Sequence, residues 1–537
     1  MKRSVAIILI VVISVAAIAL AAGIGKGTMT LIDNIGDIFG GTEENTEDAS
    51  GAQTPALPHG SDTGLKFTET EPIETEPPLP SLNSGRLDFE DLELTILMPD
   101  TFSYRREWGQ KATEDEIDEA LVIRNNDILT ELGISLQYKF APVDADEYFN
   151  LALGDRINAT EQYDIVTNGS AVMSRLAVRG ALSDLHDTEQ FPYFDFTNVN
   201  WISSVNTNLA LGGKLYFMTG FFSTAMLDSI SVMFVNGNAY NENRTDDDPE
   251  SVQTYALEGN WTYENMYKMI NAFSASMPND DILIIDRDMG NSDILCSLAA
   301  AFDADAMVRL NGGWEYSLAS NSKAEDVLTR TRELYSVDGV NQNASTEKFV
   351  AGESLFLMTK MYKDYESNMA MREMDDRYGL MPLPKYDTAQ EQYKAISADS
   401  SFIGILDHSA IEGETHGMAL SAFLQMLAER SGSGTYAPRK YGTLGYYFNR
   451  VLKPKYFGLD DSISTVTITK SIEIFDVLMY NIEFEFCNVY SSELGGIGDI
   501  WGEAYSNNKT LAQSYLDKQS EYEESLSKLD KFFGVSQ

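Results

Sequence analysis

The sequence predicts an α/β protein whose folded part begins near residue 89 and contains a parallel sheet. Strand, helix and strand patterns follow one another between residues 92 and 140, and a βαβ order makes the two strands parallel. Roughly 450 residues remain once the N-terminal segments are set aside. A chain of that length exceeds one ordinary hydrophobic core and is enough for two large lobes.

The N-terminus has the pattern of an export segment. Lys2 and Arg3 precede an uncharged apolar run from Val5 to Ala22, which is typical of a secretory signal peptide. The run is also about as long as the ~18 apolar residues of a membrane-spanning helix. We therefore expect residues 1–22 to be a signal peptide or a membrane anchor. The protein is then expected at the extracellular face of the cell membrane, tethered by this segment or secreted.

An acidic segment follows the apolar run. Residues 40–85 are rich in Glu, Thr and Pro and contain few large apolar side chains. Such a composition cannot bury enough surface to offset the loss of conformational entropy on folding. We expect residues 23–88 to form a disordered stalk.

The first folded unit is predicted from alternation and helical spacing. Residues 92–98 alternate as in a strand, and residues 117–132 place apolar side chains at helical intervals. Gly133 is placed to end that helix in a left-handed conformation. Residues 134–140 form the second predicted strand.

A third strand is predicted at residues 163–166, followed by a turn and a helix that ends at Gly180. Ligands of open α/β sheets bind at the carboxyl ends of strands. Asp100, Phe102, Asn168 and Ser170 lie at such ends and are therefore candidate ligand-binding residues. The alternative is local: Asn168 begins a turn and Ser170 caps the helix.

Later elements follow from the same patterns. Strands are expected at 231–235, 282–285, 353–358 and 401–406, and helices at 261–273, capped by Asn260 or Thr262, at 417–428 and at 508–533.

Charge and motifs exclude several classes of function. The net charge is −43, with 82 acidic and 39 basic residues, so nucleic acid is not an expected partner. The four histidines lack metal-ligand spacing, and no nucleophile elbow or phosphate-binding loop occurs. We expect no catalytic residues, no metal and no cofactor. Cys296 and Cys487 are the only cysteines and form either a disulfide or two free thiols.

Several segments together resemble the extracellular solute-binding proteins of bacterial ABC importers. They are YDIV at 163–166 with GALSDL at 180–185, SVMFVN at 231–236, NWTYE at 260–264, FVAGES at 349–354 and YGLMPLPKYD at 378–387. The last is similar to a segment of the large clostridial and bacillar members of the carbohydrate-type, maltose-binding-protein-like group. The resemblance covers nearly all of the folded part. One departure is that no lipid-accepting cysteine follows the apolar run, which favours retention by residues 5–22 as an uncleaved anchor.

The resemblance implies a two-lobed, type II periplasmic-binding-protein-like fold. Each lobe would hold a mixed, mostly parallel sheet flanked by helices, with a ligand cleft between the lobes that closes like a hinge. Lobe 1 would span 89–230 with 400–430 returning to it, and lobe 2 would span 231–399 with much of 431–537. Crossings between the lobes are expected near 225–231 and 398–403.

Sugar recognition uses aromatic faces for the ring and planar polar groups for the hydroxyls. By position in the family, the resemblance adds further cleft candidates: Asp228, Trp314, Met361, Tyr362, Tyr490 and Trp501. For each aromatic the competing interpretation is core packing, and for Asp228 it is hydrogen bonding at a hinge.

The resemblance implies a monomeric, non-enzymatic receptor that binds a sugar or oligosaccharide and delivers it to the ABC permease subunits in the membrane. Two alternatives remain open. A secreted carbohydrate-active enzyme would use two of the many carboxylates, and a sensory or adhesive surface protein would use the same fold without transport.

Overall fold

The structure is a computed structural model of the chain. It describes residues 82, 87–110, 116–158, 162–277, 280–310, 313–361, 371, 374–397, 400–407, 414–432, 444 and 466–534. The predicted leader and nearly all of the predicted stalk lie outside these residues, so both stay predictions. Among the residues described, no helix has the length and apolar character needed to cross a membrane.

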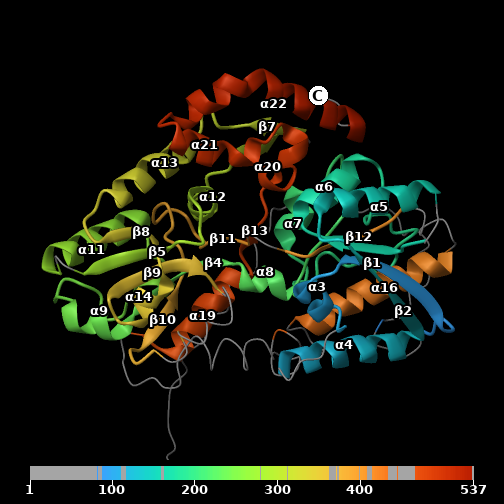
Figure 1. Ribbon diagram of the computed structural model, residues 1–537, viewed down its shortest axis with the longest axis horizontal. Coiled ribbons are helices and arrows are strands. Elements are labelled where there is room, and N and C mark those ends of the chain that lie inside the picture. Colours follow the sequence, from blue (N-terminus) through green and yellow to red (C-terminus); the bar gives the residue numbers. More distant parts are fainter. Residues whose placement is uncertain are drawn as a thin grey trace, which may run out of the picture. The chain divides into compact units, whose positions relative to one another are not determined.

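The first sheet has four strands in the order β12-β3-β1-β2 (Figure 1). β1 (Leu92–Pro99) pairs in parallel with β2 (Ile134–Ala141) and with β3 (Ile165–Asn168). β12 (Phe402–Ile405) joins the edge antiparallel to β3. The predicted βαβ unit is confirmed.

Local chemistry explains how β1 leads into β2. The connecting helix α4 (Glu116–Leu132) buries Ile117, Leu121 and Ile128. It ends at Gly133, whose φ of +60° is the left-handed conformation predicted for it. A Cβ at Gly133 would lie 2.2 Å from an oxygen of Asp88. Glycine is therefore required by both backbone conformation and space.

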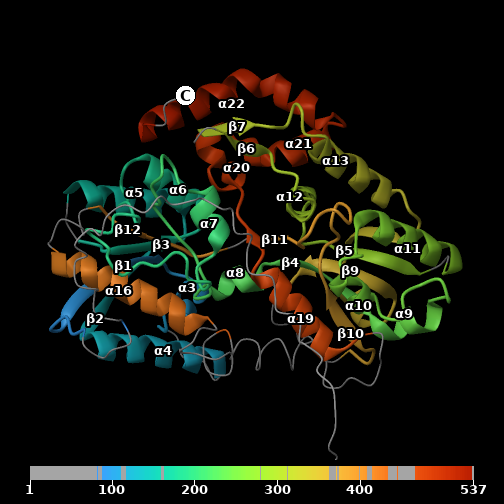
Figure 2. The same ribbon diagram turned by 180° about the vertical axis from the view of Figure 1, so that it is seen from behind.

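Helices cover both faces of the first sheet. Figures 1 and 2 show α4 and α16 (Glu414–Ser431) on one face and α5 (Ala145–Asn158) and α6 (Ser170–Val178) on the other. α3 (Phe102–Glu107) is a short helix directly after β1, packed against α4.

The second sheet has five strands in the order β10-β4-β9-β5-β8. They are β10 (Tyr378–Met381), β4 (Ser231–Asn236), β9 (Ser354–Lys360), β5 (Asp281–Asp286) and β8 (Val340–Ala344). β5 is parallel to β8 and β9, whereas β4 is antiparallel to β9 and β10. The sheet is mixed, as expected.

Helices also flank the second sheet. They are α9 (Gly237–Asn243), α10 (Val252–Leu257), α11 (Tyr263–Ser276), α12 (Asn291–Ala301), α13 (Ser322–Tyr335), α14 (Thr346–Val350) and α19 (Ile468–Met479). α11 begins after Thr262, whose side chain accepts a hydrogen bond from the Asn265 N–H. Thr262, not Asn260, is therefore the cap.

Two of the segments that the structure describes connect the sheets. The first crossing, residues 219–230, contains α8 (Thr224–Asp228) and leads into β4. The second crossing, residues 397–401, leads back into β12; its residues 398 and 399 lie outside the described ranges. The two run side by side, because Met218 bridges to Ile403 and Ile230 bridges to Ser397. Crossings were expected at these places.

The last part of the chain packs beside a hairpin, β6 (Met307–Leu310) and β7 (Gly313–Tyr316). β13 (Ile482–Glu483) pairs with β11 (Ala395–Ile396) and is followed by α20 (Phe486–Val489), η3 (Ser491–Leu494), η4 (Ile497–Asp499), α21 (Ile500–Ser506) and α22 (Leu511–Phe533). Figure 2 shows α22 next to this hairpin, and the Tyr316 hydroxyl donates to the Tyr522 carbonyl at 3.1 Å.

Candidate functional site

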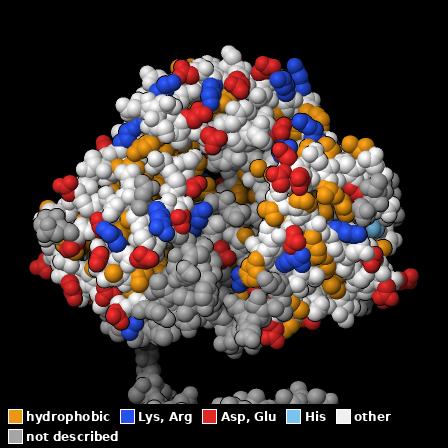
Figure 3. All heavy atoms as spheres, viewed as in Figure 1, with side chains coloured by type: hydrophobic (Ala, Val, Ile, Leu, Met, Phe, Trp, Pro, Cys, Tyr) orange, Lys and Arg blue, Asp and Glu red, His pale blue; other side chains and the backbone are white. Residues whose placement is uncertain are grey.

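A cavity of about 250 Å3 lies where the second crossing meets α6, α12 and the segment after β13. Its lining comprises Ser170, Asp293, Cys296, Ser297, Ile396, Ser397, Ser400, Phe402, Glu483, Phe484, Glu485, Asn488, Val489, Ser491, Gly498 and Asp499. Seen from the side of Figure 1, the surface in Figure 3 is hollowed near α12 and β13. We call the cavity lined by these sixteen residues the crossing cavity.

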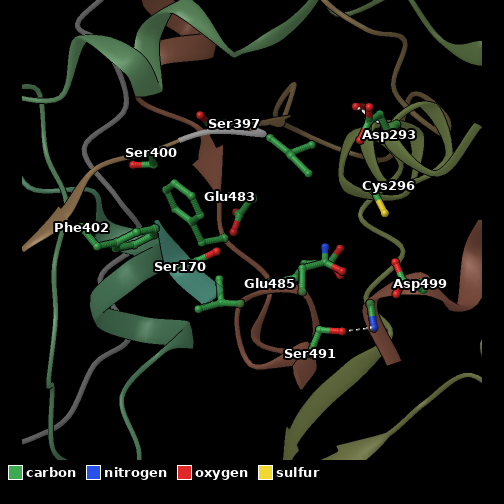
Figure 4. Close-up of a pocket in the computed structure, with 16 residues that line it drawn as sticks. Ser170, Asp293, Cys296, Ser397, Ser400, Phe402, Glu483, Glu485, Ser491 and Asp499 are labelled. Carbon is green, nitrogen blue, oxygen red and sulfur yellow. Dashed lines mark hydrogen bonds between the residues drawn. The ribbon is translucent and has the colours of Figure 1, made fainter. Parts of the chain in front are cut away.

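Figure 4 shows how the lining is arranged. Ser170, Ser400 and Phe402 lie on one side, Asp293, Cys296 and Asp499 on the other, and Glu483 and Glu485 between them. The two sides belong to different sheets, because Phe402 is in β12 whereas Ser297 of α12 is hydrogen-bonded to Ser231 at the start of β4. A solute in this cavity would therefore contact both halves of the fold.

Ser170 reaches the cavity because of the turn after β3. The strand ends at Asn168, whose side-chain oxygen accepts a hydrogen bond from the Gly169 N–H at 2.8 Å. Gly169 is the residue before α6, and Ser170 is its first helical residue. The alternative in which Ser170 caps the helix is wrong: the cap position belongs to Gly169, and it has no side-chain cap.

One face of α12 supplies the opposite wall. Asp293, Cys296 and Ser297 stand three and four residues apart, so they share a helix face. The Ser297 hydroxyl donates to the Asp293 carbonyl at 2.6 Å and is hydrogen-bonded to the Ser231 hydroxyl at 2.8 Å. This places the α12 face against the start of β4.

The third wall comes from an alternating segment. In residues 482–485 the apolar side chains of Ile482 and Phe484 are buried, whereas Glu483 and Glu485 are half-buried and line the cavity. The parallel pairing of Ile396 with Glu483 fixes this register. Both carboxylates are thereby held at the cavity.

The lining is acidic. Its described residues include the carboxyl groups of Asp293, Glu483, Glu485 and Asp499 and no Lys or Arg. Burial raises the pKa of Glu485 to about 8, with Asp305 and Glu483 adding to the effect. In the part of the chain that the structure describes, no three His, Cys, Asp or Glu side chains are placed to hold a metal ion.

A lysine lies next to the wall formed by residues 482–485. Lys394 forms ion pairs with Asp303 at 2.7 Å and with Glu483 at 3.1 Å. Burial would lower the pKa of Lys394, but the two carboxylates outweigh it and the pKa is raised. Lys394 therefore stays charged and offsets part of the negative charge of Glu483.

Cys296 and Cys487 are free thiols, so the disulfide alternative is wrong. Cys296 lines the cavity, and the buried Cys487 donates to Glu485 Oε2 at 3.2 Å. Burial raises the pKa of both thiols. Both are therefore poor nucleophiles.

A second cavity of about 200 Å3 lies on the other side of Glu485. Its lining includes Trp314, whose ring stacks on Phe486 with 4.7 Å between ring centroids. Arg309 holds the hairpin that carries Trp314, because its guanidinium donates to the carbonyls of Thr207 and Ala210 at 2.8 and 2.9 Å. Trp314 thus lines the second cavity, with Phe486 stacked on its ring and the Arg309 guanidinium 5.6 Å from the ring centroid.

A larger hollow of about 600 Å3 is lined by residues 247–251, 254, 255, 258 and Lys470. These residues belong to α10, to the segments just before and after it, and to α19, so this hollow involves only elements that flank the second sheet. We place the candidate site at the crossing cavity, where segments of both sheets meet.

Four predicted site residues follow β1 or β3. Ser170 lines the crossing cavity. Asn168 is half-buried at the end of β3. Asp100 forms an exposed ion pair with Arg105 at 2.6 Å, and Phe102 is 49% exposed at the start of α3. The last three are not in the lining of the crossing cavity.

The other predicted residues are more scattered. Asp228 ends α8 and is half-buried. Met361 is buried, and its N–H donates to the Ile230 carbonyl at 2.8 Å. Tyr490 and Trp501 are 0% exposed, which favours core packing for both rings. Tyr362 lies outside the described residues.

Sequence reasoning missed the carboxyl groups that line the crossing cavity. Asp293, Glu483 and Glu485 were not singled out, because carboxylates are too common in this chain for any one to stand out. A signal was present all the same: apolar and acidic residues alternate in 482–485, as expected of an extended segment with one buried face.

No protein-family model and no curated protein matches the chain. Solved structures do match. The sugar-binding protein MalE of Xanthomonas citri matches over 83% of this chain and 100% of its own, at 11% identity and a TM-score of 0.53. The chain has the two-lobed fold of such binding proteins. An uncharacterised protein of Listeria monocytogenes matches over 81% of this chain and 100% of its own, at 13% identity and a TM-score of 0.51.

A third structure has a bound ligand. It is the galacto-N-biose and lacto-N-biose I-binding protein of an ABC transporter from Bifidobacterium longum, in complex with lacto-N-biose. It matches over 83% of this chain and 98% of its own, at 13% identity and a TM-score of 0.50. At these identities the matches establish the fold.

Proposed function

We propose that this protein is an extracellular receptor of an ABC importer, which binds a sugar or oligosaccharide in the crossing cavity and delivers it to a membrane permease. The cavity supports this most directly, since segments of both sheets line it at the two crossings. A solute held there gains contacts only when both halves are in place. Its affinity for the closed arrangement would drive hinge closure.

The chemistry of the lining suits a hydroxyl-rich solute. Ser170, Ser397 and Ser400 supply hydroxyls, and the carboxylates accept hydrogen bonds from sugar hydroxyls. The ring of Phe402 offers an apolar surface. With four carboxyl groups and no Lys or Arg among the lining residues that the structure describes, an anionic sugar acid would be repelled. Neutral sugars and amino sugars are the expected ligands.

The remaining parts of the proposal concern the N-terminus and the partners. Residues 1–22 would direct or anchor the protein at the outer face of the membrane, and the stalk would let the folded part reach the permease. Residues 89–230 with 400–430 would form one lobe, and 231–399 with much of 431–537 the other. The receptor would act as a monomer without a cofactor.

Binding is tested by calorimetry with neutral disaccharides, glucosamine oligomers and sugar acids. A Ser170→Trp substitution would fill the cavity, and we expect at least a tenfold loss of affinity, or about 1.4 kcal/mol. Ser322→Trp is the matched control, because Ser322 is also the first residue of a helix and is exposed away from the cavity. Equal binding by both variants would place the site elsewhere.

An enzyme with this fold would use two carboxylates of the cavity, and the raised pKa of Glu485 would suit a general acid. The assay is release of reducing sugar from any oligosaccharide that binds. Binding without release supports the receptor. Release that is lost in Glu485→Gln would support the enzyme.

A further inference from the structure

The carboxyl groups of the crossing cavity are gathered at one end of it. In Figure 4, Asp293, Cys296 and Asp499 lie on one side, serine hydroxyls and the ring of Phe402 lie on the other, and Glu485 lies between them. Burial raises the pKa of the Cys296 thiol, and the charges of Glu485, Asp293 and Asp499 add to the rise. These carboxyl groups belong to α12, to η4 and to the segment after β13. Three separate segments therefore bring them to the same thiol.

The protein leaves these three carboxyl groups without a positive partner. In the part of the chain that the structure describes, no ion pair joins Asp293, Glu485 or Asp499 to a Lys or Arg. Lys394, whose charge acts on Glu485, forms its ion pairs with Asp303 and Glu483. The hydrogen bond that Glu485 accepts comes from a thiol, which is a weak donor. A bound solute is therefore the natural source of positive charge here.

We propose that the ligand of the crossing cavity is an amino sugar, whose ammonium group lies among Asp293, Glu485 and Asp499 while its hydroxyls and ring face the serines and Phe402. An ammonium group donates three hydrogen bonds, and such bonds to carboxylates are among the stronger ones. The described residues place no three His, Cys, Asp or Glu side chains to hold a metal ion, so an organic cation fits this end better. The inference rests on the proposed function for the cavity and the sugar, and it adds the charge.

Protonation of Glu485 is coupled to such a ligand. Burial raises the pKa of Glu485 to about 8, and the charges of Asp305 and Glu483 add to the rise. At pH 7 the empty cavity therefore holds Glu485 mainly in its neutral form. A positive group beside the carboxyl group lowers its pKa. Binding of an ammonium group at pH 7 should therefore release a proton.

Other titratable groups surround Glu485. Its carboxyl neighbours are Asp293, Asp305, Glu483 and Asp499, and its positive neighbours are Lys394 and Arg309, which lines the second cavity. The thiols beside it are those of Cys296 and Cys487, and burial raises the pKa of both. The thiols stay protonated at pH 7, so they are not the source of the released proton. Glu485→Gln separates the contribution of Glu485 from that of the other carboxyl groups.

The first test is calorimetry at pH 7 with sugars that differ in one substituent. The matched pairs are glucosamine and glucose, galactosamine and galactose, and the glucosamine disaccharide chitobiose and cellobiose. In each pair that binds, we expect the amino sugar to bind at least about tenfold more tightly. Comparison of buffers with different ionisation enthalpies should show proton release for the amino sugar and none for its neutral partner. Equal or tighter binding of the neutral sugars would overturn the inference.

Variants assign the preference to the carboxyl groups. Glu485→Gln should abolish the proton release and reduce the preference for the amino sugar. Glu119→Gln, an exposed change on α4, should behave as the wild type. Proton release that persists in Glu485→Gln would overturn the part given to Glu485.

The second test needs no sugar and uses Cys296 as a reporter. The native protein is treated with trimethylammonioethyl methanethiosulfonate or with the anionic sulfonatoethyl reagent, and mass spectrometry gives the labelling rate of Cys296. The same thiolate attacks both reagents, so the ratio of the two rates does not depend on its pKa. We expect this ratio to exceed that of mercaptoethanol at least about tenfold, because the carboxyl groups attract the cationic reagent. Asp499→Asn, a change at an exposed position, should lower the ratio. A ratio equal to that of mercaptoethanol would contradict the inference.

The two tests separate the inference from the proposed function. If no sugar binds while Cys296 favours the cationic reagent, the sugar receptor is wrong and the charge selectivity of the cavity stands. If sugars bind without preference for the amine and Cys296 shows no selectivity, the receptor stands and the inference is wrong.

Discussion

Glu107 and Glu485 are both enclosed carboxyl groups with raised pKa values, but the protein surrounds them differently. Glu107 receives three hydrogen bonds at one oxygen and has Arg124 nearby. Glu485 has the thiol of Cys487 as its hydrogen-bond donor and other acids as neighbours. The first arrangement gives one oxygen of the carboxyl group three donors and leaves Oε2 buried without a hydrogen-bond partner. The second arrangement places a carboxyl group among other acids at a cavity wall.

The difference between the two surroundings distinguishes a carboxyl group that stabilises the fold from one that suits ligand binding. A buried oxygen that accepts several hydrogen bonds stabilises the arrangement around it, because losing it leaves its donors without partners. A carboxyl group crowded by other acids costs stability and is better satisfied by a ligand that donates hydrogen bonds or brings positive charge. Glu107 therefore holds the first crossing, and under the proposed function Glu485 would face the ligand.

The largest expected effect tests this contrast directly. Glu107→Ala would leave the Ala225 N–H and two hydroxyls without their acceptor, and we expect a loss of about 3 kcal/mol in the free energy of unfolding. Glu485→Ala should change it by less than about 1 kcal/mol or raise it. Urea denaturation measures both. Equal losses would mean that the two carboxyl groups play the same structural part.

A second effect concerns pH. The pKa of Glu485 is raised to about 8 from an ordinary value of 4.5, so the folded state favours its neutral form. Its contribution to stability is complete below about pH 4.5 and is lost as the pH rises towards 8. The melting temperature should therefore fall between pH 5 and 8, and it should fall less in Glu485→Gln. Glu119→Gln is the control, and a wild-type slope in Glu485→Gln would contradict the expectation.

The smallest expected effect is a difference in the alkylation rates of the two thiols near Glu485, those of Cys296 and Cys487. Cys296 lines the crossing cavity and is half-buried, whereas Cys487 is buried. Both should react slowly with iodoacetamide in the native protein because their pKa values are raised. Cys296 should react first, and a bound sugar should slow it further. Mass spectrometry of the alkylated protein gives both rates, and faster labelling of Cys487 would show that the cavity lining is misassigned.

Much of the fold could be predicted because its signals are local. The alternation in β1, the helical spacing in α4 and the left-handed Gly133 each depend on a few neighbouring residues. The cap at Thr262 was one of two candidates that stand two residues apart, Asn260 and Thr262, and only the geometry selects it. The place of β12 in the first sheet follows from no local pattern; the family resemblance supplied it.

The site was harder to predict because its parts are far apart in the chain. Ser170, Asp293, Ser400 and Glu485 meet only in the folded protein, and no spacing links them. Tyr490 shows the opposite difficulty. Its residue type suits a sugar, but the chain packs the ring against Phe217 and Phe486, and its hydroxyl donates to the Leu209 carbonyl at 3.3 Å. Composition identifies an aromatic residue but not the direction in which it faces.

The edge strand β12 has a consequence for the order in which the protein can be made. Phe402 pairs with Asn168, more than two hundred residues earlier in the chain. A ribosome that has released β3 must therefore synthesise the whole second sheet before the first can be completed. Such distant pairings slow folding. During synthesis, the early strands are left with an open edge, and a chain in that state is more exposed to chaperones and proteases than the finished protein.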